Sequence, residues 1–137
     1  MGTFKVQMQV GGPAGAEFRS VDALVDTGAS HTMLPRDLLT TLEVGVIEQV
    51  AFRLADESTV EYDVGEARIR LDGRERTTLV VFGPDEAEPL LGATTLQLFN
   101  LAVDTIGERL FSVPGLLKRT VAPESNNLSE NSREDVS

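Results

Sequence analysis

The stretch Ala23-Leu24-Val25-Asp26-Thr27-Gly28-Ala29-Ser30 decides how the rest of this sequence is interpreted. Three apolar residues in succession predict a buried strand that runs directly into an Asp-Thr-Gly turn. Only the glycine of that turn lacks a Cβ, so it tolerates unusual backbone angles and a close approach of other backbone. A carboxylate at the end of a buried strand needs hydrogen-bond donors, and the nearest are Thr27 and the Gly28 amide. The tripeptide alone also fits a solvated turn between two strands.

The length and composition are those of an ordinary globular chain. Its 137 residues are 41% hydrophobic, which suffices for one domain with a sizeable core. We expect this domain to cover residues 1–115. From Thr120 onward the chain is rich in Ser, Asn and Glu and carries few larger aliphatic side chains, so we predict an acidic, disordered C-terminal tail over residues 116–137.

The scarcity of thiol and imidazole groups excludes several kinds of site. The sequence has no cysteine, so it has neither disulfides nor thiolate metal ligands. His31 is the only histidine, and a zinc site would therefore depend on carboxylates. A Ser-His-Asp triad would also need His31, yet no nucleophile-elbow motif lies near it. We expect no metal and no cofactor.

The charge and hydropathy of the chain restrict its partners. A formal net charge of −10 argues against nucleic acid or an anionic membrane as the main partner. No apolar run reaches the length of a transmembrane helix, and the first residues match neither a signal peptide nor a myristoylation site. We therefore expect a soluble, cytoplasmic protein.

Period-two alternation of apolar and polar residues predicts a mainly β protein. The predicted strands cover residues 4–10, 18–25, 50–54, 60–64, 68–71, 77–82, 101–104 and 109–113. One short helix is expected to begin at Pro35, because proline suits a first helical position. A second is expected after Leu90-Leu91-Gly92, with Leu96 facing the core.

Two hairpins are predicted between these helices. Residues 50–54 and 60–64 form the arms of the first, and its tip, residues 55–59, contains no glycine. Asp72-Gly73 is a strong hairpin dipeptide and joins the arms of the second. The last of these arms, residues 77–82, ends in a nearly continuous apolar run, which is typical of a central strand.

In their order along the chain, these features resemble the retropepsin-like aspartic proteases, the single-domain, retroviral-type branch of the aspartic peptidases. The resemblance rests on Asp26-Thr27-Gly28 with its apolar flanks, the long hairpin and Leu90-Leu91-Gly92, and it covers about residues 4–113. It implies a closed, barrel-like fold in which the Leu-Leu-Gly strand crosses beside the catalytic turn. It also implies that the hairpin of residues 50–64 is a flap that closes over bound peptide. A plain surface hairpin fits the alternation equally well, and retroviral flaps, unlike this one, carry glycines at the tip.

The chemistry of these proteases requires two carboxylates in one site. The ionised carboxylate activates a water molecule, while the protonated one polarises the scissile carbonyl. The only internal echo of the motif is Val103-Asp104-Thr105-Ile106, in which isoleucine replaces the glycine. A β-branched residue suits that turn poorly, so we predict a structural role for Asp104. The resemblance therefore implies a homodimer that brings two copies of the catalytic Asp26 together.

The resemblance also implies roles for the residues around Asp26. Thr27 would hydrogen-bond across the dyad, and Gly28 would let the backbone lie close to both the carboxylate and the peptide. The residues expected to bind substrate are Ala29, Ser30, His31, Tyr62 and Leu90. His31 equally fits a solvent-facing loop residue, and Tyr62 and Leu90 equally fit the core.

The sequence departs from retroviral members at one charged pair. Those members often pair an Asp just after the Asp-Thr-Gly-Ala with an Arg just after the apolar-apolar-Gly, whereas here these places hold Ser30 and Ala93. Losing both partners together leaves no uncompensated charge. We predict an aspartic endopeptidase that hydrolyses a peptide or protein substrate by water attack. The alternative is a catalytically silent dimerisation or peptide-binding module with the same fold, which the glycine-free flap tip and the missing pair would explain.

Overall fold

The computed structural model describes residues 3–14, 17–115 and 117. Within them, the mainly β fold with two short helices is confirmed. The elements in chain order are β1 (Lys5–Gly11), β2 (Phe18–Val25), β3 (Thr32–Pro35), α1 (Arg36–Thr41), β4 (Glu48–Arg53), β5 (Thr59–Leu71), β6 (Arg74–Gly83), β7 (Leu90–Leu91), α2 (Ala93–Leu98), β8 (Leu101–Asp104) and β9 (Arg109–Ser112). Neither helix is long and apolar enough to cross a membrane.

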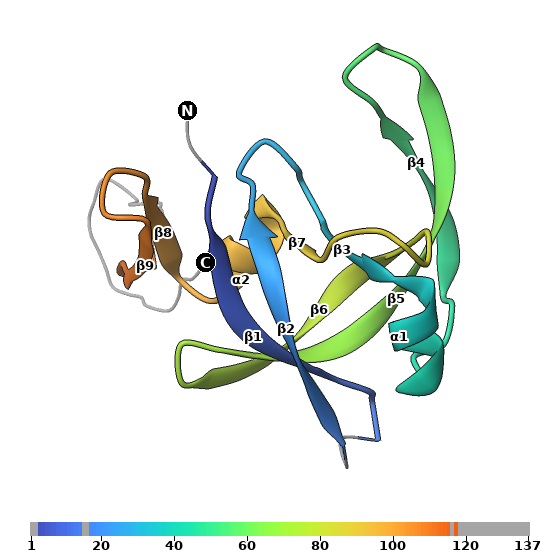
Figure 1. The fold of residues 1–137 in the computed structure, drawn as a ribbon, viewed down its shortest axis with the longest axis horizontal. Helices are drawn as coiled ribbons and strands as arrows, with labels where there is room; N and C mark the ends of the chain where they lie inside the picture. Colours follow the sequence, from blue (N-terminus) through green and yellow to red (C-terminus); the bar gives the residue numbers. More distant parts are fainter. Residues whose placement is uncertain (1–2, 15–16, 116, 118–137) are drawn as a thin grey trace, which may run out of the picture.

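Seven of the strands form one sheet that closes on itself (Figure 1). The strand order is β1-β2-β7-β3-β6-β5-β4, and β1 also pairs with β5. This second pairing makes a ring of β1, β2, β7, β3, β6 and β5, because the first and the last of these strands are joined. Strand β4 lies outside the ring and pairs with β5. Strands β8 and β9 form a separate two-stranded sheet.

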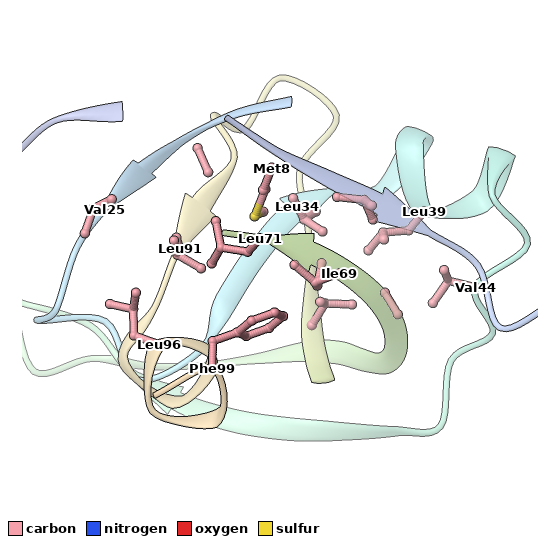
Figure 2. Close-up of a cluster of buried hydrophobic side chains, with 14 of the residues drawn as sticks. Met8, Val25, Leu34, Leu39, Val44, Ile69, Leu71, Leu91, Leu96 and Phe99 are labelled. Carbon is pink, nitrogen blue, oxygen red and sulfur yellow. The ribbon is translucent and has the colours of Figure 1, made fainter. Parts of the chain in front are cut away.

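The hydrophobic core is made by side chains that point toward one another from several strands of the ring (Figure 2). Met8 of β1, Leu34 of β3, Ile69 of β5 and Leu91 of β7 are each at most 1% exposed. Phe99, directly after α2, is the largest fully buried side chain. Burying one such side chain contributes about 1.5–3 kcal/mol relative to leaving it exposed. The core thus holds together strands that are far apart in the sequence.

Helix α1 begins one residue later than predicted. Pro35 is its N-cap residue and not its first helical residue, and the helix starts at Arg36. Pro35 has φ −59° and ψ 138°, an extended conformation, because it still belongs to β3 and pairs with Gly83 of β6. The proline ring permits this φ as readily as a helical one.

Strand β5 joins two segments that the sequence predicted as separate strands, residues 60–64 and 68–71. It runs for 13 residues and passes through the buried Gly65 without a break. The following turn contains Asp72 with φ 56° and Gly73 with φ 76°, as a two-residue hairpin turn requires. The tail predicted for residues 116–137 lies outside the described residues except for Leu117, and its boundary at residue 115 stays a prediction.

Candidate active site

Asp26 directly follows β2, at the start of the loop that leads to β3. Its backbone N–H donates to the carbonyl oxygen of Leu91 in β7 at 3.0 Å, and its Oδ1 accepts the Gly28 N–H at 2.9 Å. The Ala29 N–H donates to the Asp26 carbonyl oxygen at 3.2 Å and closes the turn. Asp26 is half-buried, whereas Thr27 and Gly28 are exposed. The turn therefore presents one oriented carboxylate at the surface.

The segment that joins β7 to α2 lies against this loop. The Ala93 N–H donates to the Ala29 carbonyl oxygen at 2.8 Å, and the Thr94 N–H donates to that of Ser30 at 3.0 Å. A Cβ on Gly92 would lie 2.5 Å from the carbonyl carbon of His31, which shows how closely the two backbones approach. Leu90-Leu91-Gly92 thus lies beside the Asp26 turn, and backbone hydrogen bonds connect the two segments.

Three buried threonines stabilise the contact between the Gly92 segment and the Asp26 loop. The hydroxyl oxygens of Thr32 and Thr95 are 2.6 Å apart, and that of Thr78 lies 3.3 Å from Thr95. The Thr32 hydroxyl also accepts the Gly92 N–H at 3.1 Å. Since β3, β6 and α2 each supply one threonine, the cluster joins all three elements to the Gly92 backbone. Buried hydroxyls of this kind are stable because they are hydrogen-bonded.

The hairpin of β4 and β5 extends away from the ring (Figure 1). Its tip is closed by the Leu54 N–H, which donates to the Ser58 carbonyl oxygen at 2.8 Å. Oδ1 of Asp56 accepts both the Ser58 hydroxyl at 2.6 Å and the Ser58 N–H at 3.0 Å, and these bonds lower the pKa of Asp56. Glu57 adopts a positive φ of 72°. An aspartate side chain thus holds a turn in which no glycine is present.

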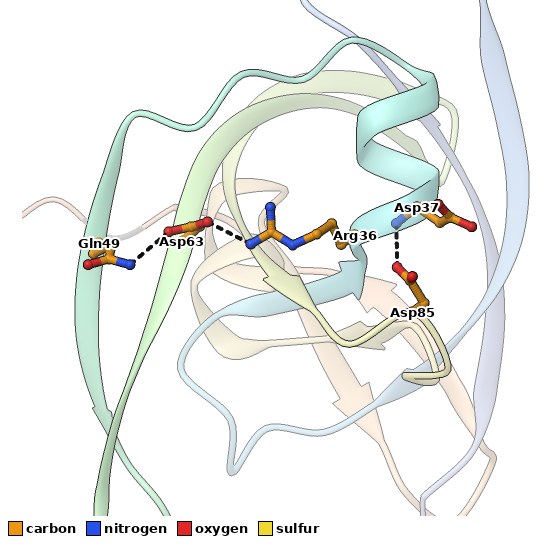
Figure 3. A network of polar contacts seen from close by, with 5 residues as sticks. All are labelled: Arg36, Asp37, Gln49, Asp63 and Asp85. Carbon is orange, nitrogen blue, oxygen red and sulfur yellow. Dashed lines mark hydrogen bonds and ion pairs between the residues drawn. The ribbon is translucent and has the colours of Figure 1, made fainter.

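The base of the hairpin is attached to α1 by a polar network (Figure 3). Arg36 donates to Asp63 Oδ2 at 2.6 Å, and Gln49 donates to Asp63 Oδ1 at 3.1 Å. The Arg36 hydrogen bond, followed by that from Gln49, lowers the pKa of Asp63. The Arg36 guanidinium also lies 5.0 Å above the Phe82 ring centroid. Helix α1, both hairpin arms and β6 therefore meet at this point.

The sequence of this chain matches a known protein family over most of the fold described above. The family model described as aspartyl protease matches residues 6–95, which run from β1 into α2. The chain belongs to the aspartyl protease family. None of the curated proteins matches the chain at a significant level.

Solved retroviral proteases share the fold of this chain. EIAV protease, complexed with the inhibitor HBY-793, is 20% identical, with a TM-score of 0.50 over 70% of this chain and 86% of that one. Simian foamy virus (mac) protease is 17% identical, with a TM-score of 0.50 over 68% of this chain and 91% of that one. A foamy viral protease-reverse transcriptase in complex with an RNA/DNA hybrid is 15% identical, with a TM-score of 0.51 over 85% of this chain and 13% of that one. At these identities the likeness shows the fold, which is retropepsin-like.

The structure brings two of the predicted substrate-binding residues, His31 and Tyr62, to one aromatic side chain. The ring centroid of Phe52 in β4 lies 5.0 Å from that of His31, with the planes at 81°, and 6.1 Å from that of Tyr62. The Ser30 hydroxyl lies 2.8 Å from His31 Nδ1. Leu90 is half-buried in β7, where it pairs with Leu24 and Met33.

The sequence analysis did not name Phe52 or the three threonines as site residues. A signal for Phe52 existed, because the alternation placed it on the same face of the hairpin as Tyr62. No pattern distinguishes Thr32, Thr78 and Thr95 from other threonines in strands and helices, because their contacts connect positions far apart in the sequence.

Asp104 has a different environment from Asp26. Its Oδ1 accepts the backbone N–H groups of Ile106 at 3.2 Å and Gly107 at 2.9 Å, and Arg109 lies 3.3 Å from Oδ2. The Gly107 hydrogen bond is the main cause that lowers the pKa of Asp104. These contacts hold the β8–β9 turn, in agreement with the structural role predicted for Asp104. Among the described side chains, no group of three or more His, Cys, Asp or Glu residues could hold a metal ion.

Proposed function

We propose that this chain is an aspartic endopeptidase and that Asp26 is its catalytic carboxylate. The observation that carries the proposal is the placement of Asp26 in a retropepsin-like fold. Its Oδ1 accepts the Gly28 amide, and its loop is hydrogen-bonded to the Gly92 segment. Those contacts hold the carboxylate in one orientation, as a group that must activate water requires. The catalytic domain that we propose covers residues 1–115.

The reaction needs a second carboxylate, which in our proposal is Asp26 of a second subunit. One carboxylate of the pair is ionised and removes a proton from water, whose oxygen attacks the scissile carbonyl carbon. The other is protonated and gives its proton to the carbonyl oxygen. Collapse of the tetrahedral species breaks the C–N bond: the amine takes the proton held by the dyad, and one hydroxyl of the former carbonyl carbon gives its proton back to the ionised carboxylate. The steps need no metal, cofactor or covalent intermediate, and the Thr27 hydroxyls would bridge the two turns.

The proposed substrate is an extended peptide held between the Asp26 loop and the β4–β5 hairpin, which acts as the flap. The residues proposed to line this path are Ala29, Ser30, His31, Tyr62 and Leu90. The contacts of Phe52 with His31 and Tyr62 support this assignment, because they bring the Asp26 loop and the hairpin together on one side of the path. The aspartate-held tip suggests that the flap moves as one hairpin, with little bending at the tip.

The decisive experiment compares the wild type with Asp26→Asn on a diverse peptide library. Asp22→Asn is a matched control, because Asp22 is an exposed aspartate in the same strand, four residues earlier. We expect cuts that vanish in Asp26→Asn, persist in Asp22→Asn and rise more steeply than linearly with protein at low concentration. Unchanged proteolysis by Asp26→Asn would show that the assignment is wrong.

The pH dependence of cleavage gives a second test. Two carboxylates in one site cannot both ionise at low cost, so an active dyad must keep one proton. Cleavage should therefore be faster at mildly acidic than at alkaline pH. A rate that still rises above about pH 8, far beyond ordinary carboxyl titration, would contradict a carboxylate dyad.

The second candidate function is a catalytically silent peptide-binding or dimerisation module. The glycine-free, hydrogen-bonded flap tip favours it, because such a tip restricts how the hairpin adapts to peptide. Tight peptide binding by wild type and Asp26→Asn alike, without turnover by either, would support the module. A stable monomer at micromolar concentration would count against both candidates.

A further inference from the structure

His31 connects the Asp26 loop with the β4–β5 hairpin, two parts that move relative to each other in the proposed function. Its ring belongs to the Asp26 loop, and its edge-on contact with Phe52, at 5.0 Å between centroids, reaches the flap. On the other side, the Ser30 hydroxyl lies 2.8 Å from Nδ1 and restricts the rotation of the ring. His31 is therefore an oriented side chain between the loop and β4.

The polar contacts that hold the tip and the base of the flap lie away from the Asp26 loop. Its tip is closed on itself by Asp56 and Ser58, and its base is attached to α1 through Asp63 and Arg36. Neither contact reaches the loop of residues 26–31. The aromatic row of His31, Phe52 and Tyr62 does, because Phe52 also lies 6.1 Å from Tyr62 on the other arm. Both arms of the flap are thus connected to the loop through a single ring.

We propose that His31 is a positioning residue that holds the flap over the Asp26 loop through Phe52. An aromatic pair in this edge-to-face geometry is favourable beyond the area it buries. A flap held near the loop before peptide arrives loses less freedom when peptide binds, so the contact should favour peptide capture. The effect on peptide capture rests on the proposed protease function. The effect of His31 on the position of the hairpin is independent of that function.

Tyr62 provides a direct measurement of the flap. The chain has one tyrosine and no tryptophan, so its intrinsic fluorescence reports on Tyr62 alone. We would measure the fluorescence anisotropy of Tyr62 in the wild type and in His31→Ala, His31→Phe and Phe111→Ala. His31→Phe restores a ring edge without the Nδ1 group, and Phe111→Ala removes an exposed aromatic ring in β9, outside the flap. Thermal unfolding of each variant checks that it is folded.

We expect the anisotropy to fall in His31→Ala, to recover in His31→Phe and to stay at the wild-type value in Phe111→Ala. Ser30→Ala should lower it to a smaller degree, because the ring then rotates more freely. Equal anisotropy in folded wild type and His31→Ala would overturn the proposal. Should His31→Ala fail to fold, equal anisotropy in wild type and Ser30→Ala would do so instead.

Peptide cleavage separates this inference from the proposed function. With an active enzyme, Phe52→Ala, which removes the partner ring of His31 and is not among the residues proposed to line the peptide path, should raise KM about two- to tenfold, the range expected from one aromatic pair, and leave kcat nearly unchanged. A fall in kcat with an unchanged KM would overturn the proposed role in capture. A protein that cuts no peptide, yet shows the expected anisotropy changes, would contradict the protease and leave the flap contact established.

Discussion

Gly92 is the residue at which the β7–α2 segment touches the Asp26 loop most closely. Its missing Cβ leaves room for the carbonyl groups of His31 and Ala29, with the Ala29 oxygen only 3.0 Å from where a Cβ would lie. Both neighbours are backbone atoms, which cannot rotate away as a side chain would. The requirement for glycine here therefore comes from packing, and a larger residue would push the Asp26 loop outward.

Gly92→Ala should lower the free energy of unfolding by about 1–3 kcal/mol, as overpacking of a tight contact typically does. Gly45→Ala is the control, because its Cβ would meet nothing within 4 Å. The control should be unchanged or more stable by up to about 1 kcal/mol, since alanine restricts the unfolded chain. Urea denaturation measures both. Equal stabilities of the two variants would show that the loop adapts to the added methyl group.

The contacts of the Thr32 hydroxyl lead to a second prediction for a single residue. Its hydroxyl accepts the Gly92 N–H and contacts Thr95, and both threonines are 0% exposed. Thr32→Val leaves that amide without its side-chain acceptor, so we expect a loss of about 1–3 kcal/mol. The exposed Thr77→Val in β6 should change stability by less than about 0.5 kcal/mol. A comparable loss in both, measured by urea denaturation, would indicate that the hydroxyl cluster has no special role.

Among the elements, the β4–β5 hairpin differs from the others in the polar network at its base. Asp63 in β5 accepts hydrogen bonds from Arg36 and Gln49, and both favour its charged form. Because its pKa is lower in the folded chain than in the unfolded one, the network stabilises the fold fully above the ordinary carboxyl pKa. The contribution decreases as the pH falls toward the lowered pKa of the folded state.

Asp63→Asn should therefore be less stable than the wild type at pH 6, and the difference should shrink below about pH 4. Glu61→Gln is the matched control, because Glu61 is exposed on the same strand. Urea midpoints measured between pH 6 and pH 2.5 provide the comparison. A difference that is the same at every pH would mean that the charge of Asp63 does not stabilise the base of the β4–β5 hairpin.

The two hairpins show which features of the elements a sequence reveals. Alternation predicted the arms around Phe52 and Tyr62, and Asp72-Gly73 predicted the second turn. The continuity of β5 was missed because Gly65 looks like a break between strands. In the structure it is buried, and a Cβ there would fall against the Gly45 carbonyl oxygen and against Phe82. Local patterns do not reveal a backbone contact made by a segment twenty residues away.

For the whole molecule, the ring of strands carries one Asp-Thr-Gly turn, while the proposed reaction needs two. Predicting the retropepsin-like fold required only the order of Asp26-Thr27-Gly28, the long hairpin and Leu90-Leu91-Gly92. How these parts join could not be predicted. The contact between Thr32 and Thr95 and the backbone bond between Ala29 and Ala93 connect residues more than sixty positions apart, and hydroxyls and amides leave no distinctive sequence pattern.

Mixing subunits tests whether two copies of Asp26 are required. Adding an equal amount of Asp26→Asn to a fixed amount of wild type should reduce the cleavage rate to about half if the subunits exchange freely in a tight dimer, because half of the wild-type chains then lie in mixed dimers. Asp22→Asn added in the same way should not reduce the rate. A rate unaffected by Asp26→Asn after full subunit exchange would indicate that one chain carries a complete site.

Strand β5 also constrains how this protein can evolve. Its first half presents Tyr62 to the aromatic row of His31 and Phe52, and its second half presents Ile69 to the core. Successive side chains of a strand point to opposite faces, so one residue inserted between them would turn one of these side chains away from its partners. Insertions and deletions within β5 should therefore survive selection only in even numbers. Variation in length by single residues should be tolerated better in the turn of residues 54–58, which joins β4 to β5, than within β5 itself.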